Sequence, residues 1–250
     1  MARLQCNFLS YTLHRAVDLT VIVPTMCFGE MMAPDPHHPE KVEYPVLYLL
    51  HGYGNNHATW NGYTSLELYA EERNLCVVML SGENMGYIDH GEDFDYFRFI
   101  SRELPEFVRM MFPVSTRRED TYIAGLSMGG FGALLHGLRD SEQFAAMGAF
   151  SPAIVMKHLV VDKPENDLYE QLRLCAREDR RIPVYMACGT KDGLYSSGKA
   201  FFQALLETGF QATWDEGELD HEWRFWNLEI ERFMDWLPRT DPWAGTKRRI

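Results

Sequence analysis

The sequence predicts an α/β fold built on a mostly parallel sheet, and two observations lead to this prediction. Short apolar runs alternate with runs of helical periodicity along the 250-residue chain. The apolar runs have no polar face, which suits strands covered by helices on both sides of a parallel sheet. Most of them end in turns rich in glycine or small residues.

About eight strands are expected. The first two, "NFLSYTL" and "VDLTVIVPT", lie close together in the chain and predict an antiparallel pair. Five continuous apolar runs predict buried parallel strands, and a more polar run predicts the last strand. These six runs cover residues 44–52, 74–82, 120–127, 144–152, 182–190 and 211–218.

Helices are expected between these strands, at 65–73, 97–112, 130–138, 199–209 and 222–237. Pro105 indicates a kink or a new first turn within the second of them. The segment 153–181 is longer than a minimal connection and predicts a short helical cap or pocket wall. We expect one domain over 1–238, followed by a loosely ordered tail over 239–250.

Composition and charge exclude several classes of protein. The net charge of −12 argues against nucleic acid or an anionic membrane as partner. The five cysteines show no C-x-x-C spacing, which favours a reducing compartment without structural disulfides. The first residues lack the apolar core of a signal peptide, and no run is long enough to span a membrane. We therefore expect a cytoplasmic protein, and a homo-oligomer stays open.

The stretch "GLSMGGFGAL" at 125–134 contains the pattern G-x-S-x-G around Ser127. It follows an apolar run and opens a helical one, the context of a sharp turn that presents a serine nucleophile. Small residues let the helix pack close behind the strand, and the helix start favours negative charge beside the serine. The alternative is a serine that is merely small enough for a tight turn. A nucleophile would also need a base, an acid and an oxyanion site.

The rest of the chain offers a base and an acid. His221 follows the last predicted strand, where this chemistry needs its base, and Asp192 follows the run 182–190. The order serine, aspartate, histidine is the one found with this type of turn. Asp220 is a rival acid, but adjacent residues rarely point the right way to share a hydrogen bond. We therefore favour Asp192.

The oxyanion site needs two backbone N–H groups. One is expected from Met128, directly after Ser127, and the other from the loop "LLHGYGNNHATW" after the first central strand. In this loop Tyr53 is the expected donor. We expect His51 to brace the loop by hydrogen bonding and not to act as the base.

These stretches, with "FISRELPEFVRMMFPVSTRREDTYIAGLSMGGFGAL" and "GELDHEWRFW", resemble the tributyrin esterase branch of the esterase D family. This family of α/β-hydrolases also includes S-formylglutathione hydrolases and feruloyl and acetylxylan esterases. The resemblance covers most of residues 1–237. It implies the same triad, Ser127, Asp192 and His221, and the same oxyanion donors, Tyr53 and Met128.

The sequence also departs from parts of the family. S-formylglutathione hydrolases usually carry a "WGQKAF"-like stretch where this chain has "SPAIVMKHLVVDKPENDLYEQ", which argues against thioester specificity. Apolar residues in this segment predict part of the wall of a substrate pocket. The expected pocket residues are Tyr87, Val155, Met156, Leu159 and Trp223.

The sequence therefore predicts a serine carboxylesterase that hydrolyses small esters with a short acyl, acetyl or feruloyl group, without cofactor or metal. Within catalysis, the alternatives are an S-formylglutathione hydrolase and an acyltransferase in which a second alcohol replaces water. Outside catalysis, the alternative is an inert α/β-hydrolase that only binds its ligand. An active-site fluorophosphonate label separates the last from the others.

Overall fold

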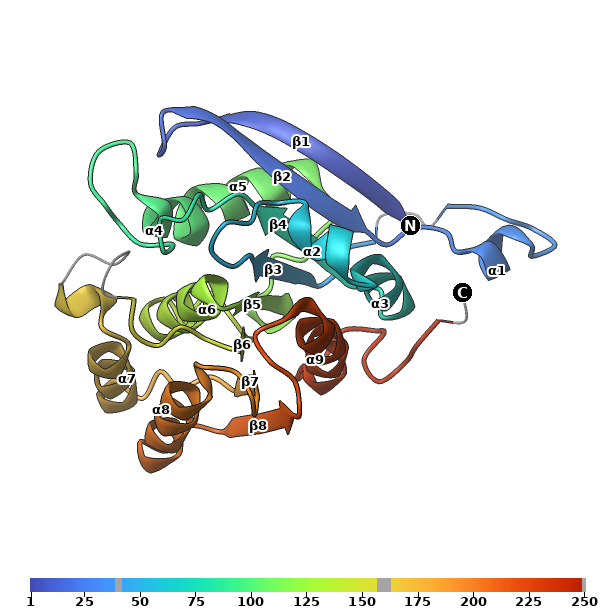
Figure 1. The fold of residues 1–250 in the computed structure, drawn as a ribbon. Coiled ribbons are helices and arrows are strands. Elements are labelled where there is room, and N and C mark those ends of the chain that lie inside the picture. The colour runs from blue at the N-terminus through green and yellow to red at the C-terminus, as the bar shows by residue number, and fades with distance from the viewer. Residues whose placement is uncertain (39–41, 157–162, 249–250) are drawn as a thin grey trace.

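The computed structural model describes residues 1–38, 42–156 and 163–248. One eight-stranded sheet runs through the molecule in the order β1-β2-β4-β3-β5-β6-β7-β8 (Figure 1). Among the described strands, the pairs β1–β2 and β2–β4 are antiparallel, and the other pairs are parallel. The strands are β1 (Ala2–Ser10), β2 (Arg15–Val23), β3 (Val46–Leu50), β4 (Cys76–Leu80), β5 (Thr121–Leu126), β6 (Ala146–Phe150), β7 (Val184–Gly189) and β8 (Ala212–Gly217). The predicted fold class is confirmed.

Helices cover both faces of this sheet and form two apolar cores. Buried side chains of α5, α6, α7 and α8 pack on one face, and those of α2, α3 and α9 on the other (Figure 1). The helices are α1 (Phe28–Met31), α2 (Thr59–Tyr63), α3 (Leu66–Glu72), α4 (Tyr96–Arg98), α5 (Leu104–Met111), α6 (Met128–Arg139), α7 (Leu168–Arg177), α8 (Tyr195–Glu207) and α9 (Trp223–Trp236). The expected single domain over 1–238 stays a prediction, and the single sheet favours it.

The helix expected over 97–112 is interrupted. A π-helical turn, Phe99–Glu103, joins α4 to α5, and Pro105 lies in the first turn of α5. Proline lacks a backbone N–H to donate, and it lies where the π-helical hydrogen-bond pattern gives way to the α-helical one. Of the two readings of Pro105, the new first turn is the correct one.

The segment 153–181 differs from the expected cap in its second half. Its helix α7 buries Leu168, Leu172 and Cys175 in the core that also contains α6. This amphipathic helix therefore covers the sheet as the crossover between β6 and β7. A cap over the remainder of the segment stays a prediction.

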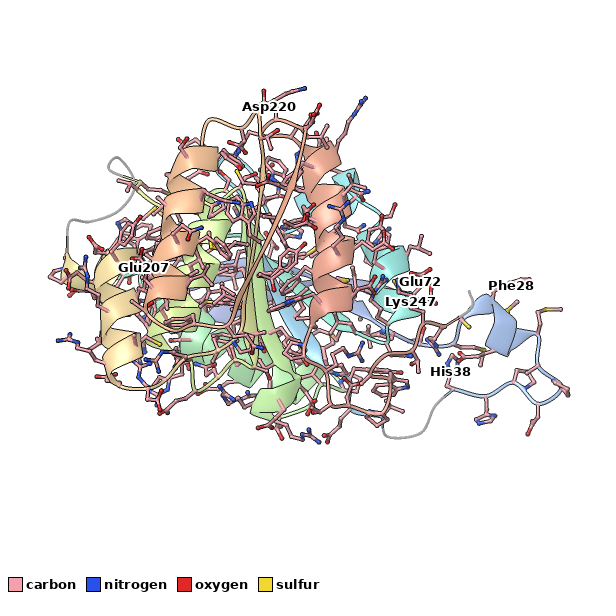
Figure 2. The ribbon with its side chains drawn as sticks, turned by 90° about the horizontal axis from the view of Figure 1, so that it is seen from below. Phe28, His38, Glu72, Glu207, Asp220 and Lys247 are labelled. Carbon is pink, nitrogen blue, oxygen red and sulfur yellow. The ribbon has the colours of Figure 1, made fainter. Side chains whose placement is uncertain are left out.

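The C-terminal tail is tied to the body, contrary to the expected loose order. Arg239 and Asp241 form a buried ion pair at 2.6 Å, and the ring of Trp243 stacks on Tyr44 with centroids 5.2 Å apart. Arg248 donates its backbone N–H to Glu72 and its guanidinium to Glu30, on the arm that carries α1. Figure 2 shows this arm, with Phe28 and His38, projecting from the body, and Lys247 beside Glu72. Within the described ranges, no helix has both the length and the apolar character needed to cross a membrane.

Glu229 of α9 is fully buried between α9, β7 and β8. Its carboxylate accepts hydrogen bonds from the Tyr185 hydroxyl at 2.8 Å and from Arg232 Nη1 at 2.8 Å. Burial, partly offset by the Tyr185 hydrogen bond and reinforced by the charge of Asp215, raises the pKa of Glu229 to about 7. The folded protein therefore holds a proton on Glu229 at pH values where the unfolded chain has already lost it.

We expect Glu229→Gln to make stability less dependent on pH. The wild type should lose stability as pH rises from about 4.5 through about 7, because folding then requires burial of a charge. Glutamine should be more stable than the wild type by roughly 1–3 kcal/mol at pH 8 and nearly equal to it at pH 5. Urea unfolding at both pH values measures this. Exposed Glu207→Gln is the control, and the same gain at both pH values would contradict the prediction.

Candidate active site

Ser127 lies on a sharp turn between β5 and α6. Its φ of 53° and ψ of −114° are strained for a residue with a side chain, which favours a functional role. The turn is possible only because the residues two before and two after Ser127 are glycines, Gly125 and Gly129. A Cβ on Gly129 would lie 2.5 Å from the carbonyl oxygen of Leu50, and one on Gly125 would lie 2.3 Å from the carbonyl oxygen of Gly129. The elbow expected from the sequence is thus present.

We expect Gly129→Ala to lower the free energy of unfolding by about 3 kcal/mol or more, because the methyl group meets backbone atoms that cannot move aside. Gly62→Ala is the matched control, since a Cβ there meets nothing within 4 Å. Alanine also favours helix α2, so this control should be neutral or slightly stabilising. Thermal unfolding followed by circular dichroism compares the two. A Gly129→Ala protein with the same melting temperature as the wild type would contradict this packing argument.

Asp192 and His221 are brought together by two parallel loops. Thr190 donates its backbone N–H to Gly217, and Lys191 donates to Leu219, so the loop after β7 runs along the loop after β8. Between these loops, His221 Nδ1 lies 2.8 Å from Asp192 Oδ2. Asp192 and His221 are therefore hydrogen-bonded, as their predicted roles of acid and base require.

Asp220 is placed differently. Its Oδ1 accepts the backbone N–H of His221 at 2.7 Å, so this carboxylate braces the loop and not the imidazole ring. Figure 2 shows Asp220 at one end of the molecule, on the loop that leads into α9. The geometry therefore favours Asp192 over its rival.

The Asp192 side chain is completely buried yet well supplied with hydrogen bonds. Burial alone would raise the pKa of this carboxyl. Hydrogen bonds from His221, from the Leu194 N–H at 2.8 Å and from the Ser151 hydroxyl outweigh burial, and the pKa lies below its ordinary value. Asp192 is thus ionised at neutral pH and can hold the Nδ1–H of a neutral imidazole. Nε2 of His221 is then left as an acceptor.

The loop after β3 lies against the elbow. A Cβ placed on Gly52 would lie 3.5 Å from the Cβ of Ser127, so the backbone beside Tyr53 passes close to the serine. Asn84 Oδ1 accepts the N–H of Gly54 at 2.6 Å and fixes the tip of the loop. Met128 is the first residue of α6, where backbone N–H groups have no partner within the helix. Both expected oxyanion donors therefore come from segments that adjoin Ser127.

His51 braces this loop, as expected. Its Nε2 accepts the N–H of Gly82 at 2.8 Å, so the proton is on Nδ1, which donates to Gly52 at 2.7 Å. Burial lowers the pKa of His51 to about 4, against the opposing effect of the Gly52 hydrogen bond. The imidazole is therefore neutral and occupied on both sides, which excludes it as the base.

The expected pocket residues differ in their burial and in their position relative to an open groove. Tyr87 is fully buried and donates its hydroxyl to the His51 carbonyl, so it supports the loop from below and is not part of an open pocket wall. Val155 is 63% exposed, and Met156 packs partly against the core. Trp223 lines an open groove between α2 and the start of α9 and stacks on Tyr63. Leu159 lies outside the described residues.

Two residues that sequence reasoning did not assign contact the Asp192–His221 pair. Ser151 hydrogen-bonds to Asp192, and the ring of Trp226 packs edge-on against the ring of His221, with centroids 4.9 Å apart. The signal available for Ser151 was its position, as a small polar residue at the end of a buried strand and just before Pro152. For Trp226, helical spacing indicated only a core residue.

The chain is similar to known proteins along most of its length. A family model described as "Putative esterase" matches residues 29–232. The chain is 31% identical to an acetyl esterase of Caldicellulosiruptor saccharolyticus, over 96% of this chain and 99% of that protein. Two solved structures from Staphylococcus aureus are each 27% identical to this chain. Each match covers 94% of this chain and 98% of the other chain. They are a substrate-bound fluorophosphonate-binding serine hydrolase, FphF, with a TM-score of 0.83, and an S-formylglutathione hydrolase, FrmB, with a TM-score of 0.82.

Proposed function

The chain belongs to the esterase family and is a serine-type carboxylic ester hydrolase, and from this premise we propose that it cleaves small, short-chain acyl esters with Ser127, His221 and Asp192. The observation that carries the proposal is the pairing of Asp192 with His221 at the sheet edge where the strained Ser127 also lies. Parallel strands end at a common edge, and β5, β7 and β8 each deliver one of these residues there.

The proposed reaction has two stages. His221 Nε2 takes the proton of the Ser127 hydroxyl while Oγ attacks the ester carbonyl carbon. The backbone N–H groups of Tyr53 and Met128 stabilise the oxyanion that forms. His221 then gives the proton to the leaving alcohol as the C–O bond breaks. In the second stage His221 deprotonates a water molecule that attacks the acyl carbonyl carbon, and it returns this proton to Ser127 Oγ as the C–Oγ bond breaks and the acid leaves.

Asp192 contributes by orientation and charge. Its carboxylate keeps the Nδ1 proton in place and stabilises the imidazolium that forms when His221 takes the serine proton. The hydrogen bonds that hold Asp192 ionised despite its burial support this role. We place the reaction in the cytoplasm, as the sequence predicts, with a small diffusible ester as substrate.

An acetyl group is the favoured acyl group, because the acetyl esterase is matched along nearly its whole length. A second candidate is S-formylglutathione hydrolysis, favoured by the likeness to the FrmB structure over 94% of this chain. The sequence that replaces the "WGQKAF"-like stretch argues against it. A short acyl group is common to both candidates.

The test is a panel of nitrophenyl esters from acetyl to octanoyl, with a feruloyl ester and S-formylglutathione as further substrates. We expect kcat/KM to be highest for acetyl or the next longer acyl groups and to fall gradually, because an apolar pocket discriminates by only ~1–3 kcal/mol per methylene. Labelling by a fluorophosphonate should be lost in Ser127→Ala. A chain that is neither labelled nor active on any substrate would refute the proposal. Added alcohol in the same assay separates hydrolysis from acyl transfer.

A further inference from the structure

Ser151 occupies a strained position beside the proposed triad. It follows β6 directly, and its neighbour Phe150 pairs with Leu126, which precedes Ser127. Ser151 therefore lies next to Ser127 along the sheet edge, between the ends of β5 and β7. It is fully buried, and its φ of 45° is in the left-handed region, which residues other than glycine, asparagine and aspartate rarely adopt. Its N–H donates to Ala187 on β7 at 2.7 Å, which helps to hold this conformation.

The partners of the Ser151 hydroxyl determine where its proton points. Trp226 Nε1 lies 3.2 Å from Ser151 Oγ, and an indole N–H can only donate. The Cys188 thiol, 3.9 Å from the same oxygen, is a second and weaker donor. Burial and the charge of Asp192 raise the pKa of Cys188 to about 12, so this thiol keeps its proton at neutral pH. With donors directed at its oxygen, the hydroxyl has its own proton available for Asp192.

We propose that Ser151 is a positioning residue that donates its hydroxyl proton to Asp192 and thereby holds the carboxylate against His221. Asp192 then receives hydrogen bonds from Leu194 at Oδ1, from His221 at Oδ2 and from Ser151, so both of its oxygens are held. Trp226 orients the Ser151 oxygen and also packs against the His221 ring, so one side chain of α9 supports both ends of the pair. This inference rests on the proposed function.

The proposal has a consequence for the pH profile. Without the Ser151 hydroxyl, Asp192 is a stronger base and binds the imidazolium form of His221 more tightly, so the base becomes protonated at higher pH. The acid limb of kcat/KM should therefore move upward. The titratable groups around the pair are the Cys188 thiol on β7, which interacts with Asp192, and Asp220 and Glu222, which flank His221 in the chain. All three are present in every variant below.

The experiment compares Ser151→Ala and Ser151→Gly with the wild type. Glycine relieves the left-handed strain and alanine does not, so their stabilities should differ, with glycine the more stable. Both should nevertheless lower kcat roughly 10- to 100-fold, with KM within about twofold, and move the acid limb up by about 0.5–1 pH unit. Kinetics from pH 5 to 9 on an ester that is stable over this range, with thermal unfolding of each variant, supply both readouts.

Ser141→Ala is the matched control, because Ser141 is also a buried serine whose hydroxyl accepts a hydrogen bond, from Arg180, but it precedes β6 whereas Ser151 follows it, so the two lie at opposite edges of the sheet. It should lose stability and keep the wild-type acid limb. If Ser151→Ala and Ser151→Gly also keep that limb while the wild type hydrolyses esters, Ser151 is only structural and the inference is overturned. If the wild type itself neither reacts with a fluorophosphonate nor hydrolyses esters, the proposed function fails instead.

Discussion

Replacing Ser127 by alanine is expected to lower kcat by about 10⁴-fold or more, as removal of a catalytic nucleophile does. The fold should be retained, because the alanine side chain differs from serine only by the hydroxyl oxygen. Stability should be equal or slightly higher, since a strained residue with the proposed catalytic role would be selected for activity and not for stability. Initial rates on nitrophenyl acetate and thermal unfolding of the same preparation measure the two quantities.

Ser196→Ala is the control for this substitution. Ser196 is exposed on α8, outside the loops that carry the candidate site, and its loss should leave kcat at the wild-type value. A Ser127→Ala protein that keeps a tenth of the wild-type rate would remove Ser127 from the mechanism. The control shows that a loss in Ser127→Ala follows from the position of the hydroxyl and not from a serine-to-alanine change or its purification as such.

Replacing Asp192 by asparagine is expected to lower kcat by roughly 10⁴-fold while the shape of the site is kept. The amide can donate to Nδ1 of His221, which stabilises the tautomer with its proton on Nε2. His221 would then have no lone pair directed at Ser127, and the imidazolium would lose its counter-charge. A rate assay over pH 6–9 should show the loss throughout, since the tautomer and not a titration causes it.

Asp220→Asn tests the rival acid under the same conditions. Because Asp220 contacts the backbone of His221 and not its ring, this variant should keep kcat within about tenfold of the wild type. Equal losses in the two variants, or a greater loss in Asp220→Asn, would contradict the choice of Asp192. The pair of substitutions thus separates two carboxylates that lie in the same loop cluster.

Most of the fold was predictable because its strands and helices carry strong periodic patterns. The buried strands read as continuous apolar runs, and α9 shows one apolar face, so both were found within a few residues. The helix α7 was misjudged as part of a cap because its apolar residues suit a pocket wall and a sheet cover equally. The tail was misjudged because its contacts, such as Trp243 on Tyr44, join residues far apart in the chain.

Some residues of the candidate site could likewise be proposed from the sequence, and others are recognised only in the structure. Ser127, Asp192 and His221 could be proposed from the sequence, because each chemical role restricts both the residue type and its place in the chain, and their catalytic roles stay a prediction. Tyr87 was assigned to the pocket from its loop position, and only the packed structure shows that its ring is enclosed by the core. Ser151 and Trp226 were missed because a buried hydroxyl and an indole N–H leave no pattern in sequence. Their roles depend on partners on other elements.

The sheet ends on one side at β8, and no strand among the residues that the structure describes pairs with the outer edge of β8. This strand carries Asp215 and Glu216, held by Arg232 and Lys199 of its own chain. If two copies joined antiparallel along this stretch, their carboxylates would face one another, in a chain whose net charge is already −12. Self-association by sheet extension is therefore disfavoured at β8 by charge repulsion, and most strongly at low ionic strength, where salt screens least.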